Sequence, residues 1–207
     1  MQPDDLTDDI LGAFDGICYV VDSEGVIRHI GARRWNAFAR ENGAPELDAG
    51  NTVGRNLFDY IQGETVCRKL TDIMAELSRS SGDIWISPFR CDSPGEQRNM
   101  RLAVTGIHEG KEVTGYLFQS VLLEADSRPP MDIYDFKAMS ALLKIHRNLP
   151  ILSMCSYCQR VRDDRYTTGE WASAETYYRR GGGAEVAISH GICDSCNGGA
   201  IERLSEL

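Results

Sequence analysis

The chain has 207 residues, of which 42% are hydrophobic and 26% charged, and its formal net charge is −9. This composition is typical of a soluble globular protein and leaves room for one domain plus a smaller module. Residues 1–130 hold most of the acidic excess, with 13 Lys and Arg against 21 Asp and Glu, and no segment forms a basic patch. The charge therefore argues against nucleic acid and anionic membranes as partners.

The N-terminal residues MQPDDLTDDI lack the basic start and apolar run of a secretory signal peptide. No stretch approaches the roughly 20 apolar residues that a membrane-spanning helix needs. We therefore expect a cytoplasmic protein without a membrane partner, in which thiols stay reduced. The seven cysteines then need a role other than disulfide formation.

Residues 5–14 predict a short helix with its apolar side chains on one side. Two β-branched runs follow, Ile17–Val21 and Val26–Ile30, on either side of the turn residues Asp22-Ser-Glu-Gly25. Because glycine adopts positive φ without strain, this pattern predicts a β-hairpin that turns at Gly25.

Helical spacing of apolar residues then predicts a helix over residues 33–42 and a longer one over 64–79. Three strand-like runs separated by turn residues come next: Ile84–Cys91, 99–107 and Val113–Leu123. Two groups of strands with helices between them predict an α+β fold, a five-stranded antiparallel sheet with helices packed on one face.

This order of elements resembles that of PAS domains over about residues 6–125. VVDSEGVIRHI is similar to the opening hairpin of that family, and TVGRNLFDYI to the stretch before its long helix. The resemblance implies a sensory or dimerisation module with a cavity for an unidentified small molecule, haem or flavin. Residues 64–79 contain no histidine for haem, and the TVCRKL segment around Cys67 lacks the pattern of flavin photosensors.

SRPP at 127–130 indicates a linker, because proline continues neither strand nor helix. The following segment, MDIYDFKAMSALLKIHRNLP, predicts a helix with Asp132 as N-cap and Pro150 as outer limit. Its apolar stripe consists of Ile133, Phe136, Met139, Leu143 and His146. Such a stripe suits packing on the sheet or a contact between two parallel helices, and we expect a homodimer.

Two C-x-x-C pairs, Cys155 with Cys158 and Cys193 with Cys196, lie 34 residues apart. Each pair can place two sulfurs on the same side of one ion, and two pairs complete a tetrahedron around Zn²⁺. The sequence therefore predicts a structural zinc ion held by four thiolates. His190 is the alternative ligand, but we assign it a supporting role beside the second pair.

MCSYCQRVRDD, GEWASAETYY and ISHGICDSC, within Leu152–Asn197, resemble a C-terminal zinc module of bacterial sensory proteins. The resemblance implies attachment to a sensory domain and no known catalytic role. Gln159 and Arg160 stand where that family usually has lysine. Between the pairs, Glu170–Arg180 predicts a helix that ends at Gly181–Gly183.

Together these patterns predict three parts: a PAS-like sensory domain (1–126), a linker and signalling helix (127–150), and a zinc-binding module (151–207). No set of side chains suggests catalysis, so we expect a non-catalytic bacterial sensor or adaptor that acts on a protein partner in a signalling pathway. The alternatives are a redox sensor, in which oxidant joins the cysteines and ejects zinc, and a zinc-dependent nucleic-acid-binding regulator.

Overall fold

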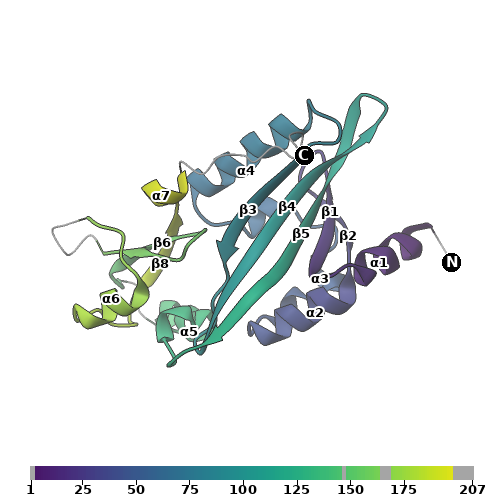
Figure 1. Ribbon diagram of the computed structural model, residues 1–207. Coiled ribbons are helices and arrows are strands. Elements are labelled where there is room, and N and C mark those ends of the chain that lie inside the picture. The colour runs from purple at the N-terminus through teal and green to yellow at the C-terminus, as the bar shows by residue number, and fades with distance from the viewer. Residues whose placement is uncertain (1–2, 146–147, 164–168, 198–207) are drawn as a thin grey trace.

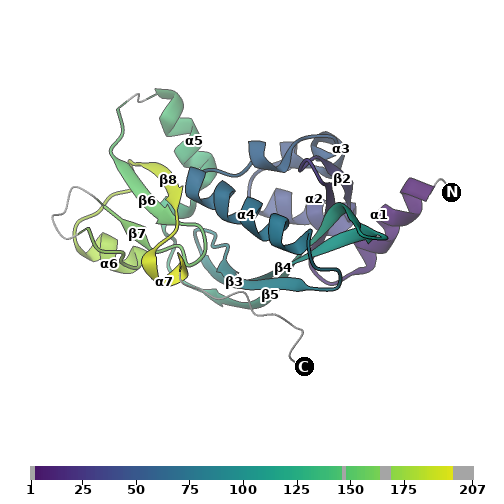
Figure 2. The ribbon, with the colours of Figure 1, turned by 90° about the horizontal axis from the view of Figure 1, so that it is seen from above.

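The structure, a computed structural model, describes residues 3–145, 148–163 and 169–197. Figures 1 and 2 show a long sheet with helices and, at one end of it, a unit built on a smaller sheet. Within the described ranges, no helix is both long enough and apolar enough to cross a membrane.

The larger sheet has five strands in the order β2-β1-β5-β4-β3, and every neighbouring pair is antiparallel. The strands are β1 Ile17–Asp22, β2 Ile27–Ile30, β3 Ile84–Arg90, β4 Glu96–Glu109 and β5 Glu112–Ser127. β4 and β5 are longer than predicted, and their pairing continues to Glu96 and Ser127. The added residues are mostly polar and lack apolar alternation, so the sequence pattern did not mark them as strand.

Helices cover one face of this sheet, as Figure 2 shows for α2, α3 and α4. The helices are α1 Pro3–Ala13, α2 Ala32–Glu41, α3 Ala49–Thr52 and α4 Glu64–Leu77, with 3₁₀ turns at Pro45–Leu47 and Leu57–Asp59. The side chains buried between the layers include Val21, Ile27, Ile30, Leu57, Ile73, Met74, Leu77, Trp85, Val104, Tyr116 and Phe118. Each such aliphatic side chain contributes about 1.5–3 kcal/mol by leaving water, which opposes the entropy that the chain loses on folding.

The hairpin between β1 and β2 turns at Gly25, whose φ is +83°. The Asp22 carboxylate accepts hydrogen bonds from the backbone N–H groups of Glu24 and Val26, both at 2.9 Å. It also pairs with Arg28. The predicted hairpin is therefore confirmed, with the carboxylate holding the turn from inside.

The helix predicted between residues 131 and 150 is shorter. A 3₁₀ turn at Asp132–Tyr134 comes first, and α5 spans Phe136–Ile145. Asp135 caps α5 instead of Asp132, because its Oδ1 accepts a hydrogen bond of 2.9 Å from the Ala138 N–H.

The apolar stripe predicted for this helix divides between two environments. Ile133 is buried in a second apolar core and Met139 is also buried, whereas Leu143 is 47% exposed. His146 lies outside the described residues. The start of the predicted linker therefore packs with the C-terminal unit.

That unit contains a three-stranded sheet in the order β7-β6-β8, formed by β6 Ile151–Cys155, β7 Val161–Arg162 and β8 Ala187–Gly191. β6 and β8 are parallel. Its helices are α6 Ala174–Arg179 and α7 Asp194–Asn197. Its core joins Ile133, Tyr134, Leu152, Met154, Val161, Ala174, Tyr177 and Val186.

The helix predicted over Glu170–Arg180 begins four residues later, at Ala174. Ser173 is the N-cap, and its side chain accepts a hydrogen bond from the Thr176 N–H. The preceding Ala172 instead pairs with Val161 in a β-bridge. The capping serine stops the helix from extending toward Glu170, because an N-cap residue has extended φ and ψ.

The architecture is thus α+β, with a PAS-like five-stranded antiparallel sheet whose helices lie on one face, followed by a small cysteine-containing unit. The fold class predicted from the order of elements is confirmed.

Candidate metal centre

Strand pairing brings the two C-x-x-C pairs together. Cys155 is the last residue of β6 and is the register partner of Gly191, the last residue of the parallel strand β8. Because the two strands are parallel, their C-terminal ends lie side by side. Cys193, two residues after Gly191, therefore lies close to the first pair. Cys196 lies one turn further on, in α7. A parallel pairing of this kind has no local sequence signal and was not predicted.

The four sulfurs of Cys155, Cys158, Cys193 and Cys196 all lie within 4.8 Å of one another. The Sγ atoms of Cys158 and Cys193 are 3.6 Å apart. A tetrahedron with Zn–S bonds of about 2.3 Å has edges of about 3.8 Å. The spacing of the sulfurs therefore fits one metal ion.

Hydrogen bonds favour negative charge on one of these sulfurs, that of Cys155. Cys155 and Cys193 are buried, and Cys158 and Cys196 are half-buried. The Cys193 N–H lies 3.4 Å from the Cys155 Sγ. The pKa of the Cys155 thiol lies well below its usual range, first because the Cys158 thiol hydrogen-bonds to it and then because backbone N–H groups point at the sulfur, against the opposing effect of burial.

Four thiolates are the ligand set that Zn²⁺ takes in closed structural sites, and soft sulfur ligands disfavour magnesium and calcium. No water or substrate position remains once four sulfurs bind. An ion here would stabilise the fold and would not activate a reactant.

His190 lies outside the sulfur cluster. Its Nδ1 is 3.2 Å from the side-chain oxygen of Gln62, a residue just before α4. The predicted supporting role beside the second cysteine pair therefore takes another form: His190 joins β8 to the PAS-like domain.

Asp92 joins the first cysteine pair to the larger sheet through its side chain and its backbone N–H. Asp92, in the turn between β3 and β4, has a fully buried side chain and pairs with Arg90 and with Arg128, the latter at 2.8 Å. Its backbone N–H donates a 3.2 Å hydrogen bond to the side-chain oxygen of Gln159, which directly follows Cys158. We call Asp92, Arg90, Arg128 and Gln159 the Asp92 junction.

Gln159 has an unusual backbone conformation. It is the one non-glycine residue with positive φ (+55°) among the described residues, and its side chain is buried. Left-handed backbone is strained for glutamine and persists where the surroundings hold it. Here the hydrogen bond from the Asp92 N–H to the Gln159 side chain helps to keep this conformation. Sequence reasoning missed Asp92, Arg128 and this use of Gln159.

Two further contacts fix the cysteine pairs against α4, one for each pair. The Lys69 ammonium donates to the Cys196 carbonyl oxygen at 3.2 Å. The same ammonium lies 5.0 Å from the ring centre of Tyr157, inside the first pair. Both cysteine pairs therefore touch the PAS-like domain through direct contacts.

No family model matches the chain, and no curated protein matches it. Forty chains of solved structures match. One is the PAS domain of BvgS from Bordetella pertussis, at 10% identity and a TM-score of 0.43, covering 69% of this chain and 97% of that one.

Another is the PAS domain of an HTR-like protein from Haloarcula marismortui, at 13% identity and a TM-score of 0.40. A third is a sensory box histidine kinase from Vibrio cholerae, at 14% identity and a TM-score of 0.33. Each of these two covers 57% of this chain and 90% of its own. At such low identity the likenesses say nothing of ligand or partner.

Proposed function

We propose that the protein is a cytoplasmic, non-catalytic sensor or adaptor of bacterial signalling. The PAS-like domain receives a signal, and a C-terminal module built on structural zinc presents a surface to a protein partner. The observation that carries this proposal is the Asp92 junction, because the Asp92 carboxylate pairs with Arg128 at the end of β5 while the Asp92 backbone N–H donates to Gln159, the residue after Cys158.

The proposed route of the signal differs from the helical linker expected from the sequence. The backbone N–H of Arg90, at the end of β3, donates a 2.7 Å hydrogen bond to the carbonyl of Tyr157. Together with Asp92 and Gln159 this makes a two-point attachment between the β3–β4 turn and the first cysteine pair. Movement at the end of the sheet would reach the metal site without passing through α5.

Hydrogen exchange tests this route. Removing zinc with a chelator should raise amide exchange in residues 151–197 and also in the β3–β4 turn, residues 90–98. Strands β1 and β2 serve as the internal reference and should keep their protection. Exchange that rises only within 151–197 would contradict the proposal.

We further propose that the protein forms a homodimer through α1 or α5. Ile10 on α1 and the following Phe14 are 51% and 46% exposed, and Leu143 and Ile145 on α5 are also exposed. Exposed apolar side chains grouped on helices favour association. The native mass at micromolar concentration should be that of two chains, and a monomer at that concentration would exclude the dimer.

A redox sensor is the second candidate, because Cys158 and Cys196 are half-buried and the Sγ atoms of Cys158 and Cys193 lie 3.6 Å apart. Peroxide would oxidise two thiolates to a disulfide, would itself be reduced to water, and would release zinc. Zinc that stays bound in millimolar peroxide would exclude this function.

A further inference from the structure

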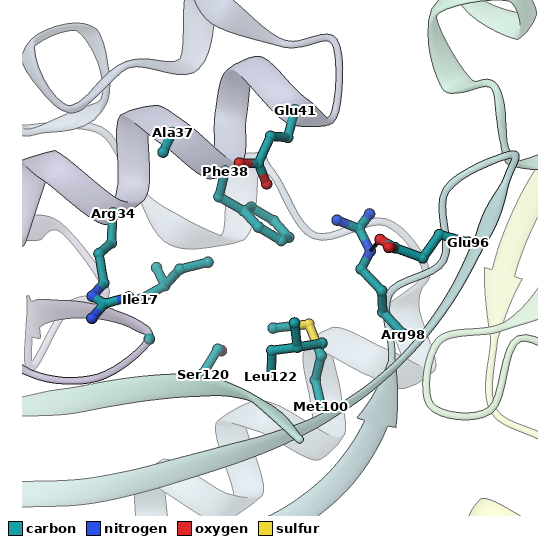
Figure 3. A pocket seen from close by; sticks show the side chains of 11 residues that line it. Ile17, Arg34, Ala37, Phe38, Glu41, Glu96, Arg98, Met100, Ser120 and Leu122 are labelled. Atoms are coloured by element: carbon teal, nitrogen blue, oxygen red, sulfur yellow. Dashed lines mark ion pairs between the residues drawn. The ribbon is translucent and has the colours of Figure 1, made fainter. Parts of the chain in front are cut away.

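A cavity of about 390 Å³ lies between α2 and one end of the larger sheet, as Figure 3 shows. It exists because the strands differ in length. β1 begins at Ile17, opposite Ser120, whereas β5 continues to Ser127 with no strand on that side. The space between α4 and the sheet is filled by the apolar core, and no residue of α4 lines this cavity.

The middle of the cavity is apolar. In Figure 3 the side chains of Ile17, Phe38, Met100 and Leu122 point into the same space. A second cavity of about 310 Å³ shares Ile17, Phe38 and Met100 and continues toward Trp35. Each of the two spaces is large enough for an apolar body of more than a few atoms.

A guanidinium group lies at each end of the cavity, and the two differ in how many of their donors have acceptors. Arg98 is 6% exposed, and its donors bind the Cys91 carbonyl and the Asn42 side chain. Its charge faces Glu96 at 3.7 Å. The Arg98 end is therefore already supplied with acceptors and with negative charge.

Arg34, at the other end, is less fully satisfied, because one of its donors, the buried Nε, has no acceptor among the described residues. A terminal nitrogen of Arg34 pairs with the Asp15 carboxylate at 3.5 Å, but both side chains are exposed, 42% for Arg34 and 77% for Asp15, so solvent screens this pair. The residue lies in the first turn of α2, which has no acidic residue and no side-chain cap. The positive end of the helix dipole adds to the charge of Arg34 there.

We propose that this cavity binds a small organic anion, an alkyl or aryl carboxylate, with its carboxylate on Arg34 and its apolar body against Phe38 and Met100. A carboxylate would supply the acceptor that Arg34 Nε lacks, and a charge-assisted hydrogen bond to guanidinium is among the strong ones. The apolar walls exclude small inorganic anions as the preferred ligand.

The binding site would also give the proposed sensor an input, and in this respect the inference rests on the proposed function. Arg98 forms part of the cavity wall, and its backbone N–H donates a 3.2 Å hydrogen bond to the Asp92 carboxylate. A ligand that moves Arg98 would therefore move a residue that is hydrogen-bonded directly to the Asp92 junction. Ligand binding and this coupling are measured separately, so one can fail without the other.

Calorimetric titration of the full chain with octanoate tests the proposal, with octanol and octylamine as probes of equal chain length. Octanoate should bind in the millimolar range or tighter, octanol about tenfold weaker, as expected for loss of a hydrogen bond to a charged group, and octylamine weaker still. The substitution Arg34→Gln should weaken octanoate about tenfold, whereas Arg33→Gln, at an exposed neighbour in the same turn, should change it less than twofold.

Ala37→Phe serves as an independent variant, because Ala37 lines the cavity and a phenyl ring there would occupy the space of the ligand. It should abolish octanoate binding while the melting temperature stays close to that of the wild type. Equal binding of octylamine, equal effects of the Arg34 and Arg33 substitutions, or no binding of octanoate at millimolar concentration would each overturn the proposal.

Discussion

The two units of the chain are held together by different means. The PAS-like domain buries a broad apolar core between its sheet and its helices. The C-terminal unit buries a smaller core, which includes Ile133 and Tyr134 from the preceding segment. Its four cysteines lie close together. A module of about fifty residues rarely folds on apolar burial alone. The first unit is therefore expected to be stable without metal, and the second to depend on it.

The largest effect should come from removing one thiolate. In Cys155→Ser the zinc content should fall from one ion per chain to nearly none, because zinc binding contributes roughly 10–16 kcal/mol to such modules. Residues 151–197 should become sensitive to protease while the five-stranded sheet stays intact. Elemental analysis and limited proteolysis measure both. Cys67→Ser, at a cysteine outside the cluster, should keep its zinc.

The next effect concerns the Asp92 junction between the units. Asp92→Asn leaves two guanidinium groups beside a buried neutral side chain and should lower the free energy of unfolding by about 3–5 kcal/mol. Asp126→Asn removes an exposed carboxylate from β5 and should change stability by less than about 0.5 kcal/mol. Denaturant unfolding gives both values. Equal effects would show that the junction is not a structural contact.

A pair of glycine substitutions isolates the contact between α4 and β8. Gly63 and Gly54 have similar positive φ angles, +93° and +85°. A Cβ on Gly63 would overlap the carbonyl oxygen of His190, whereas one on Gly54 meets nothing within 4 Å. Both alanine variants should lose about 1–2 kcal/mol to backbone strain. Gly63→Ala should lose about 1–3 kcal/mol more, unless the two units do not pack as described.

The smallest effect is a pH dependence at Glu175, which faces Arg128 across the boundary. Burial raises the pKa of this carboxyl, but hydrogen bonds from its own N–H and from Ser173, and the charges of Arg128 and Arg90, outweigh burial and lower it. Its stabilising contribution is therefore present above about pH 4.3, the unfolded value, and disappears as the pH falls through the lower folded pKa.

In Glu175→Gln this contribution should be absent at every pH. The difference in melting temperature between wild type and variant should therefore shrink as the pH falls below 4. A difference that stays constant or grows in acid would show that the carboxylate has no favourable partner in the folded protein.

The elements that the sequence predicted are those with local causes. The hairpin at Gly25 follows from a turn residue between two β-branched runs, and α4 follows from apolar residues at helical spacing. The four cysteines were found because each pair is close in sequence. None of these inferences required knowledge of which distant segments touch.

The features that the sequence did not reveal arise from distant contacts. Asp92 and Gln159 are 67 residues apart, and neither lies in a pattern that predicts burial of a carboxylate or positive φ for glutamine. The parallel pairing of β6 with β8 and the burial of Ile133 under the C-terminal unit are also non-local. The contacts of Asp92 and Gln159 hold the four-cysteine cluster against one end of the PAS-like domain.

The native mass of the purified, untreated protein tests most directly whether the C-terminal unit is built around zinc. We predict one zinc ion per chain, retained in the native spectrum and lost when the chain is denatured, and none in Cys155→Ser. A wild-type chain that is folded throughout residues 151–197 and carries no metal would contradict the account.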